Sequence, residues 1–268
     1  MNHLLRGHAP ITDAGWADVD DEAKERLVAN LAARRVVDFD GPEGWRRSAV
    51  NLGRTTPLDG GPVDGVVSSL RRVLPLAELR APFTVDREEL LNADRGAVDV
   101  DYESLDAAAL RIATAENVAV FHGWEAAGIE GIATVTPHPV VPLGDDVEGW
   151  TRKVAGAVEV LRVSGVDGPY ALVLAPDRHT AVVETAEHGG YPLFDHLREI
   201  VGGPIVRAPG VRGGAVVSLR GGDFLFASGQ DLSVGYEHHD HSTVHLYLEE
   251  SFTFRVATPE AAVALGDG

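Results

Sequence analysis

Four short apolar runs between residues 211 and 256 carry the strongest periodic signal in the chain. In each run every second residue is apolar, and Gly-Gly pairs or a polar His/Asp stretch separate the runs. The runs are Ala215-Val217-Leu219, Phe224-Phe226, Val244-Leu246-Leu248 and Phe252-Phe254-Val256. Such alternation predicts consecutive antiparallel strands with one buried face. No nucleophile or phosphate-binding loop interrupts them, so we interpret this stretch as scaffold.

Three- and four-residue spacing predicts helices elsewhere. A helix is expected from Asp13 to about Arg35, capped by Thr12, and its apolar stripe contains Trp16, Val19, Ala23, Leu27 and Leu31. The same spacing predicts helices beginning at Ser104 and at Val147. Pro192 is well placed as the first residue of a fourth, shorter helix.

Shorter strands are expected between these helices. One runs from Val36 to Asp40, and another covers residues 79–85, where Pro82 requires an edge position or a bulge. Residues 170–174 are almost wholly apolar, which suits a central strand. Because helices and strands alternate along the whole chain, we predict an α+β fold of two interleaved lobes.

Residues 46–75 behave differently from the rest. Short apolar pieces are scattered among glycines, prolines and polar residues, and they are too few to bury this segment. Composition alone indicates a flexible surface loop.

Charge and composition exclude several classes of protein. Acidic residues outnumber basic ones 41 to 23, a net charge of -18, which argues against a nucleic-acid-binding surface. The chain has no cysteine, so disulfides, thiolate catalysis and cysteine-ligated zinc are excluded. The N-terminus lacks the apolar region of a signal peptide, and no run approaches the roughly 20 apolar residues of a membrane span. We therefore expect a cytoplasmic protein with no membrane partner.

Two polar clusters could carry chemistry. His238, His239, Asp240, His241 and His245 are possible metal ligands, but adjacent side chains of an extended chain point in opposite directions. We interpret this stretch as a polar loop between strands, and a metal-dependent enzyme remains the less favoured alternative. Glu184, Glu187 and His188 could form an acid/base pair, but no nucleophile or orienting group lies near them in the sequence.

Several blocks spread from end to end resemble encapsulins of the family 1, linocin-like type, which are bacterial and archaeal shell proteins. The blocks are HAPITDAGW at 8–16, ARRVVDFDGPEGW at 33–45, LPLAELRAPFTVD at 74–86, FHGWEAAGIEGI at 121–132, GVDGPYALVL at 165–174, RGGDF at 220–224, GQDLSVGY at 229–236 and VHLYLEESFTF at 244–254. Each block is weak alone, but their shared order is specific.

The resemblance implies the tailed-phage major capsid fold. Residues 1–45 would hold the N-terminal helix and the start of a peripheral domain, and 46–75 an extended two-stranded arm that pairs with a neighbouring subunit. Residues 76–268 would form interleaved peripheral and axial domains, the peripheral one built on the third helix and a helix at 191–201. A five-fold pore loop near 184–192 would be lined by Glu184, Glu187, His188, Gly189, Gly190 and Tyr191, and would favour cations.

The implied function is compartmentation rather than catalysis. Many copies, commonly sixty, would enclose a cargo enzyme, either a dye-decolourising peroxidase or a ferritin-like iron-storage protein. The cargo's C-terminal targeting peptide would dock on Leu27, Leu31, Arg34, Asp38, Leu232, Val234 and Tyr236, although core packing is the alternative role of the apolar members.

Two further implications of the resemblance concern a bound cofactor and the contents of the shell. Some encapsulins stack a flavin on a Trp after the strand at 79–85. Here the matching segment 87–91 has no aromatic residue, so no cofactor is expected. A viral or prophage capsid protein of the same fold stays open as an alternative. The acidic balance and the lack of a basic N-terminal arm count against the nucleic-acid packaging that it would require.

Overall fold

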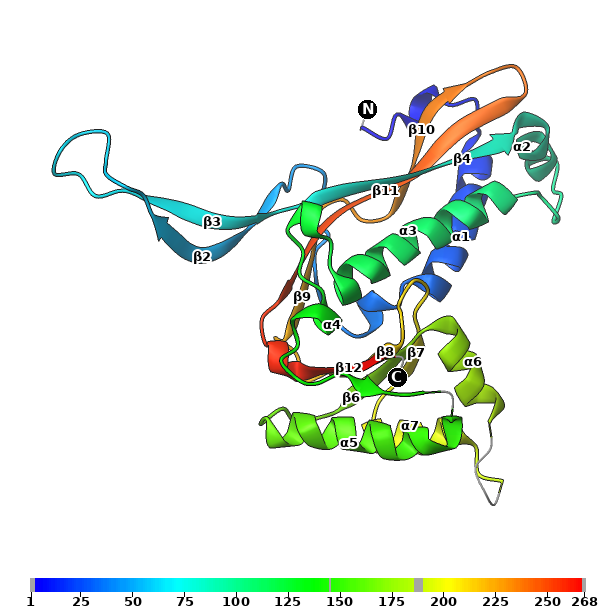
Figure 1. Ribbon diagram of the computed structural model, residues 1–268. Helices are drawn as coiled ribbons and strands as arrows, with labels where there is room; N and C mark the ends of the chain where they lie inside the picture. Colours follow the sequence, from blue (N-terminus) through cyan, green and yellow to red (C-terminus); the bar gives the residue numbers. More distant parts are fainter. Residues whose placement is uncertain (1–2, 145, 186–189, 267–268) are drawn as a thin grey trace.

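Two five-stranded sheets and one projecting arm organise the chain, as a computed structural model shows for residues 3–144, 146–185 and 190–266 (Figure 1). The larger sheet and its helices form the upper part of the molecule in this view. The smaller sheet and its helices form the lower part, and the arm extends to the left.

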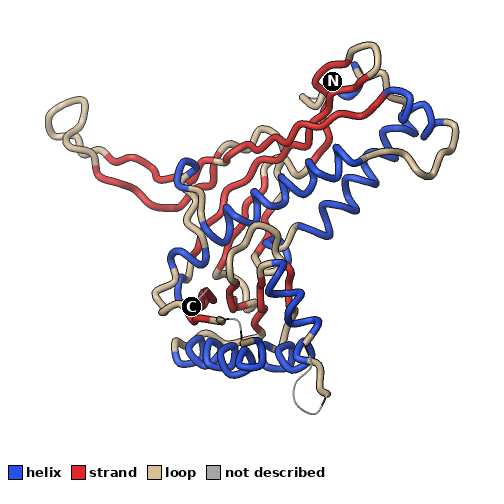
Figure 2. Tube along the Cα trace, turned by 45° about the vertical axis from the view of Figure 1, so that its right-hand side comes forward, coloured by secondary structure: helices blue, strands red, loops and turns tan. Residues whose placement is uncertain are grey.

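The larger sheet has the order β1-β9-β11-β10, and β4 pairs with β11. Its strands are β1 (Asp38–Asp40), β4 (Ala77–Asp86), β9 (Phe224–Ser228), β10 (Ser233–His239) and β11 (Thr243–Val256). Helices α1 (Asp13–Asn30) and α3 (Glu103–His122) lie side by side along it, and α2 (Arg87–Asp94) follows β4 (Figures 1 and 2). The 3-10 turns η1 (Arg6–His8) and η2 (Ala33–Arg35) flank α1.

The smaller sheet has the order β5-β12-β8-β6-β7. Its strands are β5 (Val141–Pro142), β6 (Tyr170–Leu174), β7 (Ile205–Arg207), β8 (Gly214–Ser218) and β12 (Ala262–Gly266). Its helical elements are η3 (Glu125–Ala127), α4 (Ile132–Val135), η4 (Val147–Gly149), α5 (Trp150–Val163), α6 (Pro176–Glu184), α7 (Leu193–Val201) and η5 (Pro259–Ala261). As expected, β6 is an interior strand, and all five of its residues are buried.

The arm consists of β2 (Ala49–Pro57) and β3 (Ser69–Pro75), which pair antiparallel with each other. The extended two-stranded arm is thus confirmed, and the flexible loop suggested by composition is wrong. Backbone pairing builds the arm, and apolar burial contributes little: most of its residues are exposed, and Val67 is 97% exposed.

Two clusters of buried apolar side chains form the core, and α3 joins them. Leu105 and Ile112 of α3 pack with α1 and the larger sheet, whereas Val120 and Phe121 pack with the smaller sheet. The two lobes are therefore interleaved, as the alternation of helices and strands predicts.

Helix α1 begins as predicted but ends five residues early, at Asn30 instead of Arg35. Its N-cap is Thr12, whose Oγ1 accepts from the Gly15 N–H. At the other end, the buried side chain of Asn117 accepts from the N–H groups of Ala32 and Ala33 and donates to the carbonyl of Asn30. This contact across 84–87 residues of sequence replaces the helical hydrogen bonds.

The C-terminal strands differ from the prediction in three ways. The last two apolar runs form one strand, β11, because its two halves pair with different neighbours, β4 and β9. The first run, β8, belongs to the smaller sheet. Two strands, β10 and β12, were not predicted.

Two expectations about the helices also need correction. In the structure, α5 packs against α7, and both helices belong to the lobe of the smaller sheet. Helix α6 belongs to the same lobe, because it contacts α7 and β6. The third helix and the 191–201 helix are therefore in the same lobe as α6, which ends at Glu184, and not in a separate domain from it. Pro192 is the N-cap of α7 and not its first residue. The edge position expected for Pro82 is confirmed, since β4 pairs with β11 alone among the described strands.

Candidate functional site

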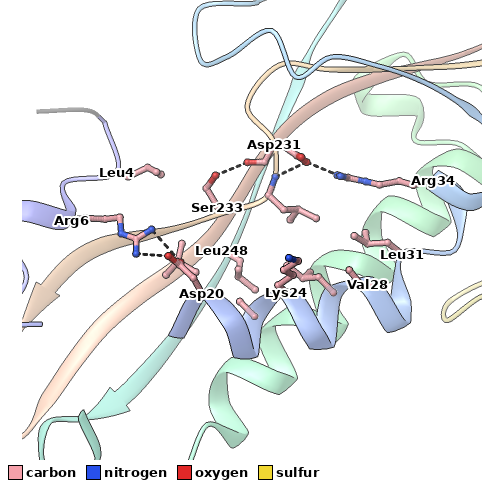
Figure 3. A pocket seen from close by; sticks show the side chains of 14 residues that line it. Leu4, Arg6, Asp20, Lys24, Val28, Leu31, Arg34, Asp231, Ser233 and Leu248 are labelled. Carbon is pink, nitrogen blue, oxygen red and sulfur yellow. Dashed lines mark hydrogen bonds and ion pairs between the residues drawn. The ribbon is translucent and has the colours of Figure 1, made fainter. Parts of the chain in front are cut away.

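A groove of about 420 Å³ lies between α1, the N-terminal segment and the start of β10 (Figure 3). Fourteen residues line it: Leu4, Arg6, Asp20, Ala23, Lys24, Leu27, Val28, Leu31, Arg34, Asp231, Leu232, Ser233, Val234 and Leu248. We call it the α1–β10 groove.

Apolar side chains from a helix and a sheet form the floor of the groove. Leu27 and Leu31 are four residues apart and so lie on one face of the chain leaving α1. Val234 and Leu248 are a cross-strand pair of β10 and β11 and face the same side of the sheet. An extended peptide with aliphatic side chains could bury them against this floor.

Charged groups lie at both ends of the floor. At one end, the Arg6 guanidinium donates to both carboxylate oxygens of Asp20, at 3.2 and 2.7 Å. At the other, Arg34 Nη1 donates to Asp231 Oδ1 at 2.6 Å (Figure 3). A bound peptide would therefore meet hydrogen-bonding groups at its two ends and apolar contacts between them.

Arg34 also contacts two buried carboxyl groups. Its Nε donates to Glu116 Oε2 at 2.7 Å, and its Nη2 donates to Glu250 Oε2 at 2.9 Å. Burial alone would lower the pKa of the Arg34 guanidinium, but the three carboxyl groups around it raise that pKa above its ordinary value. Arg34 is therefore permanently charged and held on three sides.

The structure brings five of the seven predicted docking residues together: Leu27, Leu31, Arg34, Leu232 and Val234 line the groove. Asp38 and Tyr236 do not line it. Asp38 lies on β1, where its Oδ2 accepts from the Gly222 N–H at 2.7 Å. Tyr236 is only 8% exposed, packs in the core beside α1, and its hydroxyl pairs with His239 Nδ1 at 2.6 Å.

Several lining residues were missed by the sequence analysis. Lys24 and Val28 could have been found, because each stands three residues before a predicted docking leucine, Leu27 or Leu31, on a predicted helix. Leu4 and Arg6 carried no signal, since tertiary contacts place them: the Leu4 carbonyl accepts from the Tyr236 N–H.

The predicted pore residues lie at the far end of the smaller sheet. Glu184 is the last residue of α6 and is exposed, as are Gly190 and Tyr191. The Tyr191 hydroxyl donates to Glu199 Oε1 at 3.1 Å, and this hydrogen bond raises its pKa. Glu187, His188 and Gly189 fall outside the described residues.

The histidine cluster occupies the tip of the β10–β11 hairpin. His238 and His245 form a cross-strand pair with rings stacked at 4.0 Å, so the strands extend further into this stretch than predicted. Asp240 closes the turn by accepting from the N–H groups of Ser242 and Thr243. Within the described ranges, no three His, Cys, Asp or Glu side chains are grouped to hold a metal ion.

Among the helices that the structure describes, none combines the length and the apolar character of a membrane span.

Comparison with known proteins gives a consistent result. A family model described as "Encapsulating protein for peroxidase" matches residues 1–253. The type 1 encapsulin shell protein of Rhodospirillum rubrum is 47% identical, over 99% of this chain and 96% of that protein. The Mycobacterium tuberculosis type 1 encapsulin shell protein is 42% identical, over 99% of both chains.

Solved structures show the same fold at lower identity. The virus-like particle from Pyrococcus furiosus superposes with a TM-score of 0.63 at 17% identity, covering 92% of this chain and 98% of that one. The capsid of an empty GTA particle superposes with a TM-score of 0.54 at 16% identity, covering 89% and 90%.

Proposed function

This chain belongs to the encapsulin shell proteins, and from that membership we propose that its shell encloses a cargo enzyme docked by a peptide in the α1–β10 groove. As a member of this family it is a self-assembling structural protein with a capsid-like fold and not an enzyme. The observation that carries the docking proposal is the groove itself, with an apolar floor and charged ends.

The groove suits a short extended peptide with two or three aliphatic anchors. Leu27, Leu232 and Leu248 offer apolar contacts along the floor. Each aliphatic side chain buried there would contribute about 1.5–3 kcal/mol before the cost of ordering the peptide. Arg34 and Asp231 at one end would set the register of the peptide.

The cargo that we propose is a dye-decolourising peroxidase or a ferritin-like iron-storage protein carrying a C-terminal targeting peptide. The description of the matching family supports the first, because it names a peroxidase as the enclosed protein. Docking through a tethered peptide would let one groove serve either enzyme.

We also propose a cytoplasmic shell of sixty copies with a cation-favouring pore loop near residues 184–192. Glu184 and Tyr191 are exposed at this end of the molecule, and a ring of such residues would repeat around a five-fold axis. In the arm, exposed apolar side chains support pairing with a neighbouring copy: Leu58, Val63, Val66, Val67, Leu70 and Val73.

Leu232→Asp tests the docking proposal. A carboxylate on the groove floor would lose its hydration if a peptide covered it, so we expect intact shells that are empty of cargo. Shells purified from the native host would be weighed by native mass spectrometry and their contents identified. Leu91→Asp is the control, because Leu91 is 47% exposed on α2, away from the groove lining. Native cargo at wild-type level in Leu232→Asp shells would refute the groove assignment.

A further inference from the structure

Two buried carboxyl groups contact Arg34 at the end of the α1–β10 groove. Glu116 of α3 is 0% exposed and Glu250 of β11 is 1% exposed. Arg34 donates to one oxygen of each, whereas the second oxygen, Oε1, of each has no hydrogen-bond partner among the described residues. Buried acceptors of this kind normally have a partner, because losing hydration without a replacement is costly.

A count of charges shows an excess of negative charge around Arg34. The charged groups that act on the pair are Arg34 itself, from η2, and Asp231, from the segment between β9 and β10. If every carboxyl were ionised, one guanidinium would face three negative charges, two of them shielded from water. The free-energy cost of dehydrating a second buried carboxylate would exceed the electrostatic stabilisation that a single shared guanidinium provides.

One proton shared between Glu116 and Glu250 removes one of the two excess negative charges, and the charge that it removes is a buried one. Both carboxyl groups accept from the same guanidinium, that of Arg34, and each has one oxygen without a partner in the described part of the chain. A protonated Glu250 can donate its O–H to the ionised Glu116, which keeps its ion pair with Arg34. Burial raises the pKa of both groups, and the neighbouring charge of Glu116 raises that of Glu250 further.

We propose that Glu116 and Glu250 hold one proton between them and thereby position Arg34, so that the groove is ordered while the proton is bound and loosens when it leaves. This inference rests on the proposed docking function of the groove. The link is Asp231, whose Oδ1 accepts from Arg34 Nη1 at 2.6 Å and from the Leu232 N–H at 2.8 Å. A displacement of Arg34 would therefore move Asp231, and through it the backbone of Leu232 on the groove floor.

The pH dependence has a defined sign. The pKa of each group is raised in the folded chain above that of an ordinary glutamate, so the stabilisation is complete below the ordinary value. It is lost as the pH rises through the apparent pKa of the pair. Both the stability of the subunit and the order of the groove should thus decrease toward alkaline pH.

Glu250→Gln and Glu249→Gln form a matched pair of variants. The amide introduced by Glu250→Gln can donate to Glu116 as a protonated carboxyl would, without a titrating proton. Glu249 is the next residue on β11 and is 0% exposed, but its carboxylate is paired with Arg80 at 2.6 Å and with His3 at 2.9 Å. The same substitution there removes a buried carboxylate that has its own cation.

Infrared spectroscopy of assembled, cargo-free shells tests the proton directly. Ordinary carboxyls are ionised at neutral pH, so the carbonyl stretch of a protonated acid should report one group per subunit in the wild type. We expect this band to vanish in Glu250→Gln and to persist in Glu249→Gln. A wild-type spectrum without it would overturn the proposal. Glu116→Gln, which should also lose the band, replaces Glu250→Gln if that variant does not fold.

Stability and exchange against pH test the consequence for the groove. As the pH rises above the ordinary glutamate pKa, the unfolding temperature and the corrected hydrogen-exchange protection of the Leu232 amide should fall in the wild type and in Glu249→Gln. In Glu250→Gln both should be nearly flat, and identical slopes in all three would contradict the proposal. These measurements need no cargo, so they can succeed even if Leu232→Asp shows that the groove binds no peptide.

Discussion

At the scale of single residues, Asn117 of α3 determines where α1 ends. It is fully buried, and its amide makes four hydrogen bonds, to the chain around Asn30–Ala33 and to the Pro209 carbonyl. These bonds end α1 and turn the chain into η2, which carries Arg34 to the groove. One amide thus connects α1, α3 and the smaller sheet.

Asn117→Ala should destabilise the subunit strongly. The substitution leaves buried backbone groups without hydrogen-bond partners, and each such group lowers the free energy of unfolding by about 1–3 kcal/mol. We expect a total decrease on the order of 3 kcal/mol. The unfolding temperature of the unassembled subunit would measure it. Asn92→Ala is the control, since Asn92 bonds Glu89 and Arg95 on the surface of α2 and should change stability by less than about 0.5 kcal/mol. Equal effects of the two variants would contradict this role of Asn117.

At the scale of elements, the arm differs from the rest of the described chain because most of its residues are exposed. β2 and β3 bury little apolar surface against each other, and a two-stranded hairpin is marginal in water. Its apolar side chains therefore require a partner surface, and in a self-assembling shell the available surface is another copy. We therefore propose that the arm is an assembly element, stabilised by contact with a neighbouring copy.

The double variant Val66→Asp/Val67→Asp should fold but not assemble. Both residues are more than half exposed in the subunit, so two carboxylates there leave the fold intact. At a contact between copies they would have to be dehydrated, at a cost of several kcal/mol.

Size-exclusion chromatography should then show subunits or small oligomers in place of shells, with an unchanged circular-dichroism spectrum. Val98→Asp is the control, because Val98 is 100% exposed between α2 and α3. If the double variant formed normal shells, the arm tip would not take part in the contacts between copies, and the prediction would be wrong.

At the scale of the whole molecule, the charge balance separates a cargo shell from a nucleic-acid capsid. The net charge of -18 follows from 41 acidic and 23 basic residues, and a genome would need Lys/Arg clusters to neutralise its phosphates. Copies of such a chain also repel one another, so the contacts between them must overcome this repulsion, which salt screens.

Purified shells should therefore contain no nucleic acid. We expect uniform hollow particles in negative-stain micrographs, with an ultraviolet spectrum of protein alone. Assembly should also be faster at about 0.15 M salt than at about 0.01 M salt, where the Debye length increases from about 8 to about 30 Å. Nuclease-protected nucleic acid inside the particles would favour the phage-capsid alternative.

The sequence alone was sufficient for features whose signal lies in neighbouring residues. The stripe from Trp16 to Leu27, the Thr12 cap and the buried strand at 170–174 follow from local periodicity and are present in the structure. The ordered blocks identified the fold and with it the arm, which composition alone would have left as a loop. Five of the seven predicted docking residues line one groove, and they come from α1 and its C-cap, η2 and the segment around β10.

Contacts between distant residues settled the remainder. The end of α1 depends on Asn117, 87 residues after Asn30, and the joining of two apolar runs into β11 depends on pairing with both β4 and β9. Arg34 meets Glu116 and Glu250 only when three elements pack together. Periodicity reports which side of an element is buried. It does not report which buried polar group will be opposite another, and that pairing determines where a helix ends and where a proton is held.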